Sequence, residues 1–165
     1  LKPLAEIGAS IHIVAHAFGK ITLFFAAGAI YVASKKTELP QLAGIGRRMP
    51  WTMTAFTIGA LSMIGVPPTG GFVSKWYILA GAFESDNYVA IFTIIASTVL
   101  NAAYFLPIIF AAWFGKEALE GGKEHGEAPW PAVLALTFTA ALTILFFLFN
   151  GPVIELERQL LGAVS

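Results

Sequence analysis

The sequence contains no cysteine and little charge. The lack of cysteine excludes disulfides, thiolate metal sites and cysteine nucleophiles. Only 12% of the 165 residues are Asp, Glu, Lys or Arg, about half of the share that is usual in a soluble domain. Ten basic residues balance ten acidic ones, so the chain lacks the basic excess that a nucleic-acid partner would require.

Apolar residues take the place of the missing charge. They make up 57% of the chain, and 14 Phe, four Trp and four Tyr suit contact with lipid and anchoring at its surface. This composition predicts an all-α, polytopic transmembrane helix bundle in a lipid bilayer. No strong repeat and no linker divides the sequence, so we expect a single transmembrane domain over residues 1–165. Because the first residue is Leu, we expect a piece of a longer protein.

Four hydrophobic segments are separated by polar loops. Three of them, at residues 11–33, 88–114 and 129–150, are each long enough at about 1.5 Å per residue to cross an apolar layer of about 30 Å. The loop after the first segment is strongly basic, which places it on the cytoplasmic side by the positive-inside rule. The loop before the last segment is polar, and its charges and histidine are expected to form a solvated face; they include Lys116, Lys123, His125 and Glu127.

The fourth segment, at residues 51–84, has the sequence PPTGG in its middle. A straight helix of this length would extend about 51 Å, too long for one crossing, while each half alone is too short. Proline removes a backbone donor and glycine releases the chain from helical geometry. We therefore predict one crossing made of two half-helices, broken at residues 67–70, with a re-entrant hairpin as the alternative. The residues that make the break are Pro67, Pro68, Gly70 and Gly71.

Three ionisable residues share one face of the first segment. His12, His16 and Lys20 are spaced four residues apart and so follow one another along one side of a helix. An ionisable group at membrane depth needs a partner or a hydrated cavity, and histidine exchanges a proton near neutral pH. The stripe predicts an internal proton path. The alternatives are a solvated His12, a His16 bonded to a backbone carbonyl, and a metal-ligating pair, although no cysteine and no carboxylate on that face would complete a metal site.

Lys75 follows the break by one helical turn. Unwound backbone at membrane depth must be satisfied by protein or water, and discontinuous helices mark ion sites in transporters. We expect the Lys75 ammonium to reach back to the carbonyl groups that the break frees and to exchange a proton there. The alternative is a kink made for packing, with the lysine snorkelling to an interface. Polar residues predicted to line the same cavity are Thr69, Ser74 and Asn101, although Asn101 and Thr98 could instead join helices.

Two motifs carry a resemblance to a known family. They are H-x-x-x-H-A-x-x-K-x-x-L-F, which begins at His12, and G-A-L-S-x-x-G-x-P-P-x-x-G-F-x-S-K, which ends at Lys75. With their separation, over residues 9–83, they resemble the antiporter-like, proton-conducting membrane subunits shared by respiratory complex I and Mrp-type cation/proton antiporters. Within that family the sequence is similar to the D subunit of Mrp-type Na⁺/H⁺ antiporters.

The resemblance implies that this chain is the C-terminal third of a subunit built from inverted repeats, each with a broken helix. It places His12, His16 and Lys20 on a central hydrophilic axis and makes Lys75 the terminal proton-exchange residue. It implies other membrane subunits as partners, H⁺ and Na⁺ or another monovalent cation as transported ions, no cofactor, and a bacterial inner membrane as the location. The glutamate–lysine pair of the first repeat is missing from this sequence.

Other functions stay open at the level of sequence. One is a proton-pumping subunit of a complex I-like NADH dehydrogenase or hydrogenase, although nothing resembles a quinone, flavin or iron–sulfur site. Another is a structural assembly subunit with no transport of its own. A haem anchor using His12 and His16 is the last, and their position on one helix prevents them from bracketing a haem from both faces.

Overall fold

All regular structure in the part of the chain that the structure describes is helical. The computed structural model describes residues 3–116 and 126–164, and the all-α prediction is confirmed. In chain order the elements are α1 (Pro3–Ser34), the short 3-10 helices η1 (Leu39–Leu42) and η2 (Ile45–Arg47), α2 (Pro50–Ile64), α3 (Gly70–Glu84), α4 (Tyr88–Phe114), α5 (Trp130–Leu148) and α6 (Gly151–Val164).

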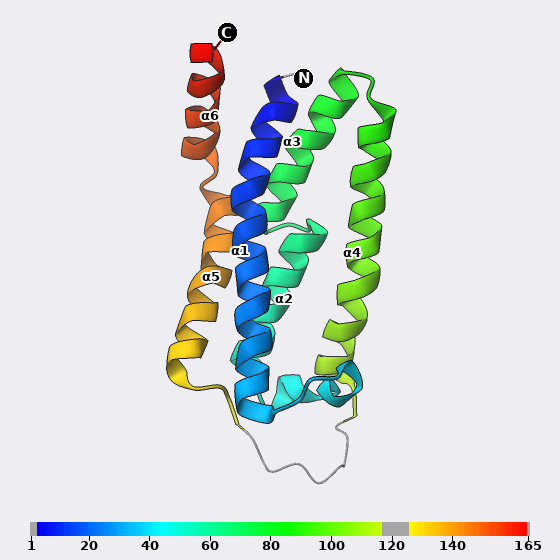
Figure 1. The fold of residues 1–165 in the computed structure, drawn as a ribbon, viewed down its shortest axis with the longest axis vertical. Helices are drawn as coiled ribbons and strands as arrows, with labels where there is room; N and C mark the ends of the chain where they lie inside the picture. The colour runs from blue at the N-terminus through cyan, green and yellow to red at the C-terminus, as the bar shows by residue number, and fades with distance from the viewer. Residues whose placement is uncertain (1–2, 117–125, 165) are drawn as a thin grey trace.

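Helix α1 runs the length of the bundle, and the two half-helices α2 and α3 follow one another beside it (Figure 1). α2 packs against one half of α1 and α3 against the other half, and the chain continues in the same direction from α2 into α3. α4 and α5 each contact both α2 and α3. The prediction of a broken helix is therefore confirmed, and the course of the chain differs from that of a hairpin.

Three of the described helices, α1, α4 and α5, are long and apolar enough to cross a membrane. α2 and α3 have 15 residues each, and a helix of that length rises only about 22 Å. Large apolar side chains cover the outside of the bundle, where Phe92 is 73% exposed and Phe110 is 65% exposed. Water-soluble monomers rarely expose apolar surface on this scale, so these faces suit contact with lipid.

Two apolar clusters hold α1 to the short helices on either side of the break. Ile30, Met53 and Leu136 belong to the cluster that joins α1, α2 and α5. Ile11 and Val73 belong to the cluster that joins α1, α3 and α5. Helix α1 is therefore packed against α2 on one side of the break and against α3 on the other. This packing places the polar residues of α1 alongside the break.

Helix α1 begins earlier than the segment predicted from hydropathy. Its first residue is Pro3, and proline is tolerated in the first turn of a helix, where its missing N–H would have no helical partner. Ile7 is 2% exposed, so the added turns are fixed by packing and not only by local preference. The charge of Glu6 interrupts the hydropathy pattern in these turns.

Candidate functional site

The break between α2 and α3 covers residues 65–69. Gly65 ends α2 with φ of +89°, and its N–H donates to the carbonyl oxygen of Leu61 at 2.8 Å. A residue with a side chain rarely adopts this backbone conformation, which is why glycine is common at the ends of helices. The predicted break at Pro67 and Pro68 is present, but it begins two residues earlier, and Gly70 already starts α3.

Lys75 reaches back across the break and binds the end of α2. Its Nζ donates to the carbonyl oxygens of Met63 at 3.1 Å and Ile64 at 2.9 Å. A third bond joins Nζ to Oγ1 of Thr98 on α4 at 3.1 Å. The last carbonyls of a helix lack partners within that helix, and an ammonium has three hydrogens to donate. The contact that the sequence predicts is therefore made, with three acceptors for three hydrogens.

The stem of Lys75 depends on the absence of a side chain at Gly65. A Cβ atom at Gly65 would lie 2.7 Å from Cδ of Lys75, well inside van der Waals contact. A cavity of about 240 Å³ borders the lysine between α3 and α4, and its lining includes Thr98 and Trp76. Gly65 thus ends α2 and also makes room for the lysine that binds there.

Two buried serines meet at Gly71. The N–H of Gly71 donates to Oγ of Ser62 at 3.2 Å, and its carbonyl accepts from Oγ of Ser74 at 3.1 Å. Ser74 Oγ also lies 2.9 Å from Nδ1 of His12 on α1. A Cβ atom at Gly71 would overlap the carbonyl oxygen of Ser62. A chain of hydrogen bonds through Ser74 and the backbone of Gly71 therefore joins α1, α2 and α3 beside the break.

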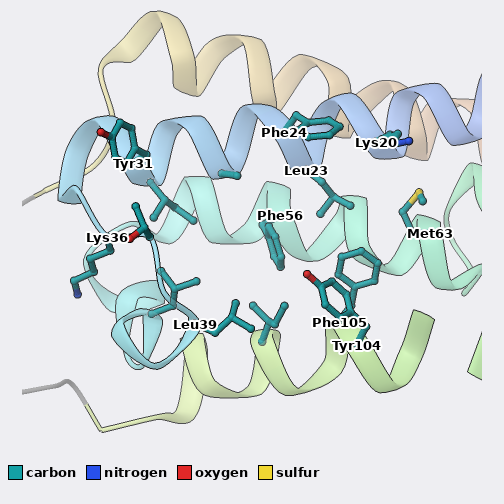
Figure 2. Close-up of a pocket in the computed structure, with 15 residues that line it drawn as sticks. Lys20, Leu23, Phe24, Tyr31, Lys36, Leu39, Phe56, Met63, Tyr104 and Phe105 are labelled. Carbon is teal, nitrogen blue, oxygen red and sulfur yellow. The ribbon is translucent and has the colours of Figure 1, made fainter. Parts of the chain in front are cut away.

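The other members of the predicted stripe lie further along α1. The rings of His12 and His16 have centroids 5.5 Å apart, and both side chains are half-buried. Lys20 is exposed and lines a mostly apolar cavity of about 520 Å³ between α1, α2 and α4. Figure 2 shows Lys20 and Met63 at one end of this cavity and Lys36 at the other. Met63 is shared, because its carbonyl oxygen binds Lys75 and its side chain borders the cavity of Lys20.

Thr69 and Asn101 occupy different environments. Thr69 is buried in the break and donates to the carbonyl oxygen of Val66 at 2.6 Å, which satisfies one carbonyl that the break frees. Asn101 donates from Nδ2 to the carbonyl oxygen of Ser97 at 2.8 Å, within its own helix. Of the two residues, only Thr69 is brought to the break by a bond that the structure describes.

Sequence reasoning missed the role of Glu127. Its carboxylate accepts from the N–H of Trp51 at 3.0 Å and from Oγ1 of Thr52, at the first turn of α2. Glu127 is half-buried, and its carboxylate satisfies donors that a helix start leaves free, a contact that the predicted solvated face did not include. Lys123 and His125 of the same loop lie outside the described residues. No local signal identifies this contact, since 75 residues separate Glu127 from Thr52.

Ser62 was also missed, although a signal for it existed. It is the serine of the G-A-L-S motif, eight residues before Gly70, where α3 begins. A small hydroxyl residue near the end of an apolar half-helix can satisfy a donor across a break.

Comparison with known proteins shows which family this chain resembles. Residues 4–101 match the family described as "NADH:quinone oxidoreductase/Mrp antiporter, TM". NADH-quinone oxidoreductase subunit N of Desulforudis audaxviator (strain MP104C) is 42% identical over 126 residues, covering 76% of this chain and 25% of that protein. The D subunit of the Na⁺/H⁺ antiporter of Alkalihalophilus pseudofirmus is 32% identical over 156 residues, covering 94% of this chain and 31% of that protein.

A solved structure shares the fold. A chain of the Mrp complex from Dietzia sp. DQ12-45-1b superposes with a TM-score of 0.84 at 19% identity, covering 95% of this chain and 37% of that chain. The present chain spans only about a quarter to a third of the length of the two relatives above. The resemblance carried by the two motifs is confirmed: the chain is an integral membrane protein and belongs to the NADH:quinone oxidoreductase/Mrp antiporter transmembrane family.

Proposed function

We propose that this chain is part of a proton-translocating, antiporter-type subunit that works in a multi-subunit membrane complex. The observation that carries the proposal is the contact of the Lys75 ammonium with the carbonyl oxygens of Met63 and Ile64. A charged amine held by backbone oxygens at a helix break, beside a cavity, is suited to gain and lose a proton.

Protons move between His12, His16, Lys20 and Lys75 through water around the break. The bond between His12 and Ser74, the adjacent ring of His16, and the shared position of Met63 support this path. Lys75 passes protons to one side of the membrane, and coupling arises as neighbouring charges change. The path uses side chains, backbone oxygens and water, with no covalent chemistry and no cofactor.

In the membrane, α2 and α3 together form one crossing, which makes residues 1–165 a single domain with four crossings. The exposed apolar faces and the course of α2 into α3 support this arrangement. The basic loop that contains Lys35 and Arg47 faces the cytoplasm, and the membrane is the bacterial inner membrane.

The coupled process is the exchange of Na⁺ or another monovalent cation for H⁺. The 32% identity to the D subunit of a Na⁺/H⁺ antiporter supports this assignment. A second candidate is proton pumping driven by a redox reaction elsewhere in a complex, which the 42% identity to a NADH-quinone oxidoreductase subunit N supports. In either case, neighbouring subunits supply the groups for cation exchange or for the redox reaction that this chain lacks.

Proton uptake in membrane vesicles tests the proposal, with the complete subunit in its complex. Lys75→Ala is expected to abolish uptake, both in the presence and in the absence of added Na⁺. Lys116→Ala is the matched control, because it removes an exposed lysine far along the chain from the break. Unchanged uptake in Lys75→Ala would contradict the proposal and favour an assembly role.

The same vesicles separate the two coupled processes. Uptake in the unmodified complex that depends on a Na⁺ gradient supports cation exchange. Proton uptake that depends on NADH and does not change with the Na⁺ gradient supports the redox-driven candidate.

A further inference from the structure

Ser74 connects a histidine of α1 to the first turn of α3, one residue before Lys75. Its Oγ lies 2.9 Å from Nδ1 of His12 and 3.1 Å from the carbonyl oxygen of Gly71. Ser74 is 0% exposed, and these two atoms are the partners that the described residues provide for its hydroxyl group. The direction of the two bonds decides which nitrogen of His12 carries hydrogen.

A count of hydrogens fixes that direction. A serine hydroxyl donates one hydrogen and can also accept, whereas a carbonyl oxygen only accepts. Both bonds exist together only when Nδ1–H of His12 donates to Ser74 and Ser74 donates to Gly71. If Ser74 instead donated to Nδ1, the Gly71 bond would be lost at a fully buried site, where polar groups retain their partners.

We propose that Ser74 is a positioning residue that holds neutral His12 with its hydrogen on Nδ1, which leaves Nε2 as the atom that takes up and releases a proton. Only the statement that this proton is a transported one rests on the proposed function. The titratable neighbours of His12 are His16 on the same helix and Lys75 on α3, both close enough to act on its charge. Neither makes a described hydrogen bond to His12, so Ser74 selects the tautomer.

The backbone of Gly71 anchors Ser74 beside His12. The backbone of Gly71 is bound by Ser74 at its carbonyl oxygen and by Ser62 at its N–H. The imidazole of His12 is thereby tied to the backbone at the start of α3, not to a mobile side chain. A ring fixed in this way takes up and releases its proton at one nitrogen atom.

Nitrogen NMR of the complete subunit in lipid, labelled with ¹⁵N-histidine, tests the assignment. Spectra are recorded at alkaline pH, where the imidazole is neutral, and the His12 signals are identified by their loss in His12→Asn. We expect the one-bond N–H coupling at Nδ1 in the unmodified protein. In Ser74→Ala we expect the ratio of the two tautomers to shift toward Nε2–H by about fivefold, the effect of losing one hydrogen bond.

One control variant accompanies the test, and proton uptake gives a second readout. Ser85→Ala removes a hydroxyl at the other end of α3, one that donates to the carbonyl oxygen of Gly81 at 2.5 Å, and it should leave the His12 spectrum unchanged. Proton uptake of Ser74→Ala should fall about tenfold, the lower end of the effect of groups that fix histidine tautomers at metal sites.

An Nε2–H tautomer in the unmodified protein would overturn the proposal, and so would an Nδ1–H tautomer that persists in Ser74→Ala. Failure of the proposed function would look different. In that case the His12 spectra would behave as expected, while Lys75→Ala left proton uptake intact.

Discussion

The ammonium nitrogen of Lys75 lies 2.9 Å from the carbonyl oxygen of Ile64, so a side chain of α3 binds the last residue of α2. The two half-helices are therefore joined by charge as well as by the connecting residues. Carbonyl oxygens at the C-terminal end of a helix carry partial negative charge, which favours a cation there. A variant of Lys75 can therefore separate the contribution of its positive charge from the contribution of proton exchange.

Lys75→Arg is expected to preserve the bundle and to abolish proton uptake. Arginine keeps the positive charge and the hydrogen-bond donors, but its guanidinium group does not lose a proton in proteins. The measurement is proton uptake in vesicles, with the amount of assembled complex determined in parallel. Normal uptake in this variant would show that Lys75 contributes charge alone.

Thr98→Val is expected to reduce proton uptake about fivefold, because it removes the oxygen that accepts from Lys75 at 3.1 Å. Thr93→Val serves as the control on the same helix. Thr93 is exposed and its hydroxyl donates to the carbonyl oxygen of Val89 at 2.7 Å. Uptake is measured in both variants at equal protein levels, and an equal loss in the two would argue against a specific role for Thr98.

Gly71→Ala is expected to destabilise the protein by about 1–3 kcal/mol, the usual cost of forcing extra volume into a packed site. The new Cβ atom would overlap the carbonyl oxygen of Ser62. Gly28→Ala is the matched control, since nothing lies within 4 Å of its Cβ position. That control should be neutral or stabilising by up to about 1 kcal/mol, because alanine favours helix. Thermal unfolding in detergent compares the two, and equal midpoints would contradict the packing at Gly71.

Glu127→Ala is expected to loosen the start of α2 at a cost of about 1 kcal/mol, the typical effect of losing a helix cap. The variant leaves the N–H of Trp51 and the hydroxyl of Thr52 without their carboxylate acceptor. Hydrogen exchange of the backbone amides at the start of α2 measures the change. Glu84→Gln, at the exposed end of α3, should leave that exchange rate as it is. Unaltered exchange in Glu127→Ala would show that the cap contributes nothing.

The break and the contact of Lys75 follow from local chemistry, and both could be predicted from the sequence. Two consecutive prolines prevent a continuous helix at residues 67–68, glycine releases the chain from helical geometry, and the freed carbonyls attract the nearest cation that can reach them. The start of the break at Gly65 was not predicted. Ordinary hydropathy treats that glycine as part of an apolar run, whereas its positive φ is what ends α2.

Contacts between distant segments could not be predicted in the same way. Helical spacing shows that His12, His16 and Lys20 share a face of α1, but it does not show what packs against each part of that face. In the structure α3 provides a partner for His12, whereas Lys20 opens onto an apolar cavity. Glu127 illustrates the same limit, since its role depends on which helix start its loop meets.

The match of three hydrogens on Lys75 to three oxygen atoms has a consequence for Thr98. A neutral amine keeps two hydrogens, enough for the carbonyl oxygens of Met63 and Ile64, and its nitrogen gains a lone pair. Because a threonine hydroxyl can donate as well as accept, the bond between Lys75 and Thr98 can reverse its direction when the proposed loss of a proton occurs. Both carbonyls at the end of α2 then keep a donor in either state of the amine, and an infrared band of these carbonyls would report whether they do.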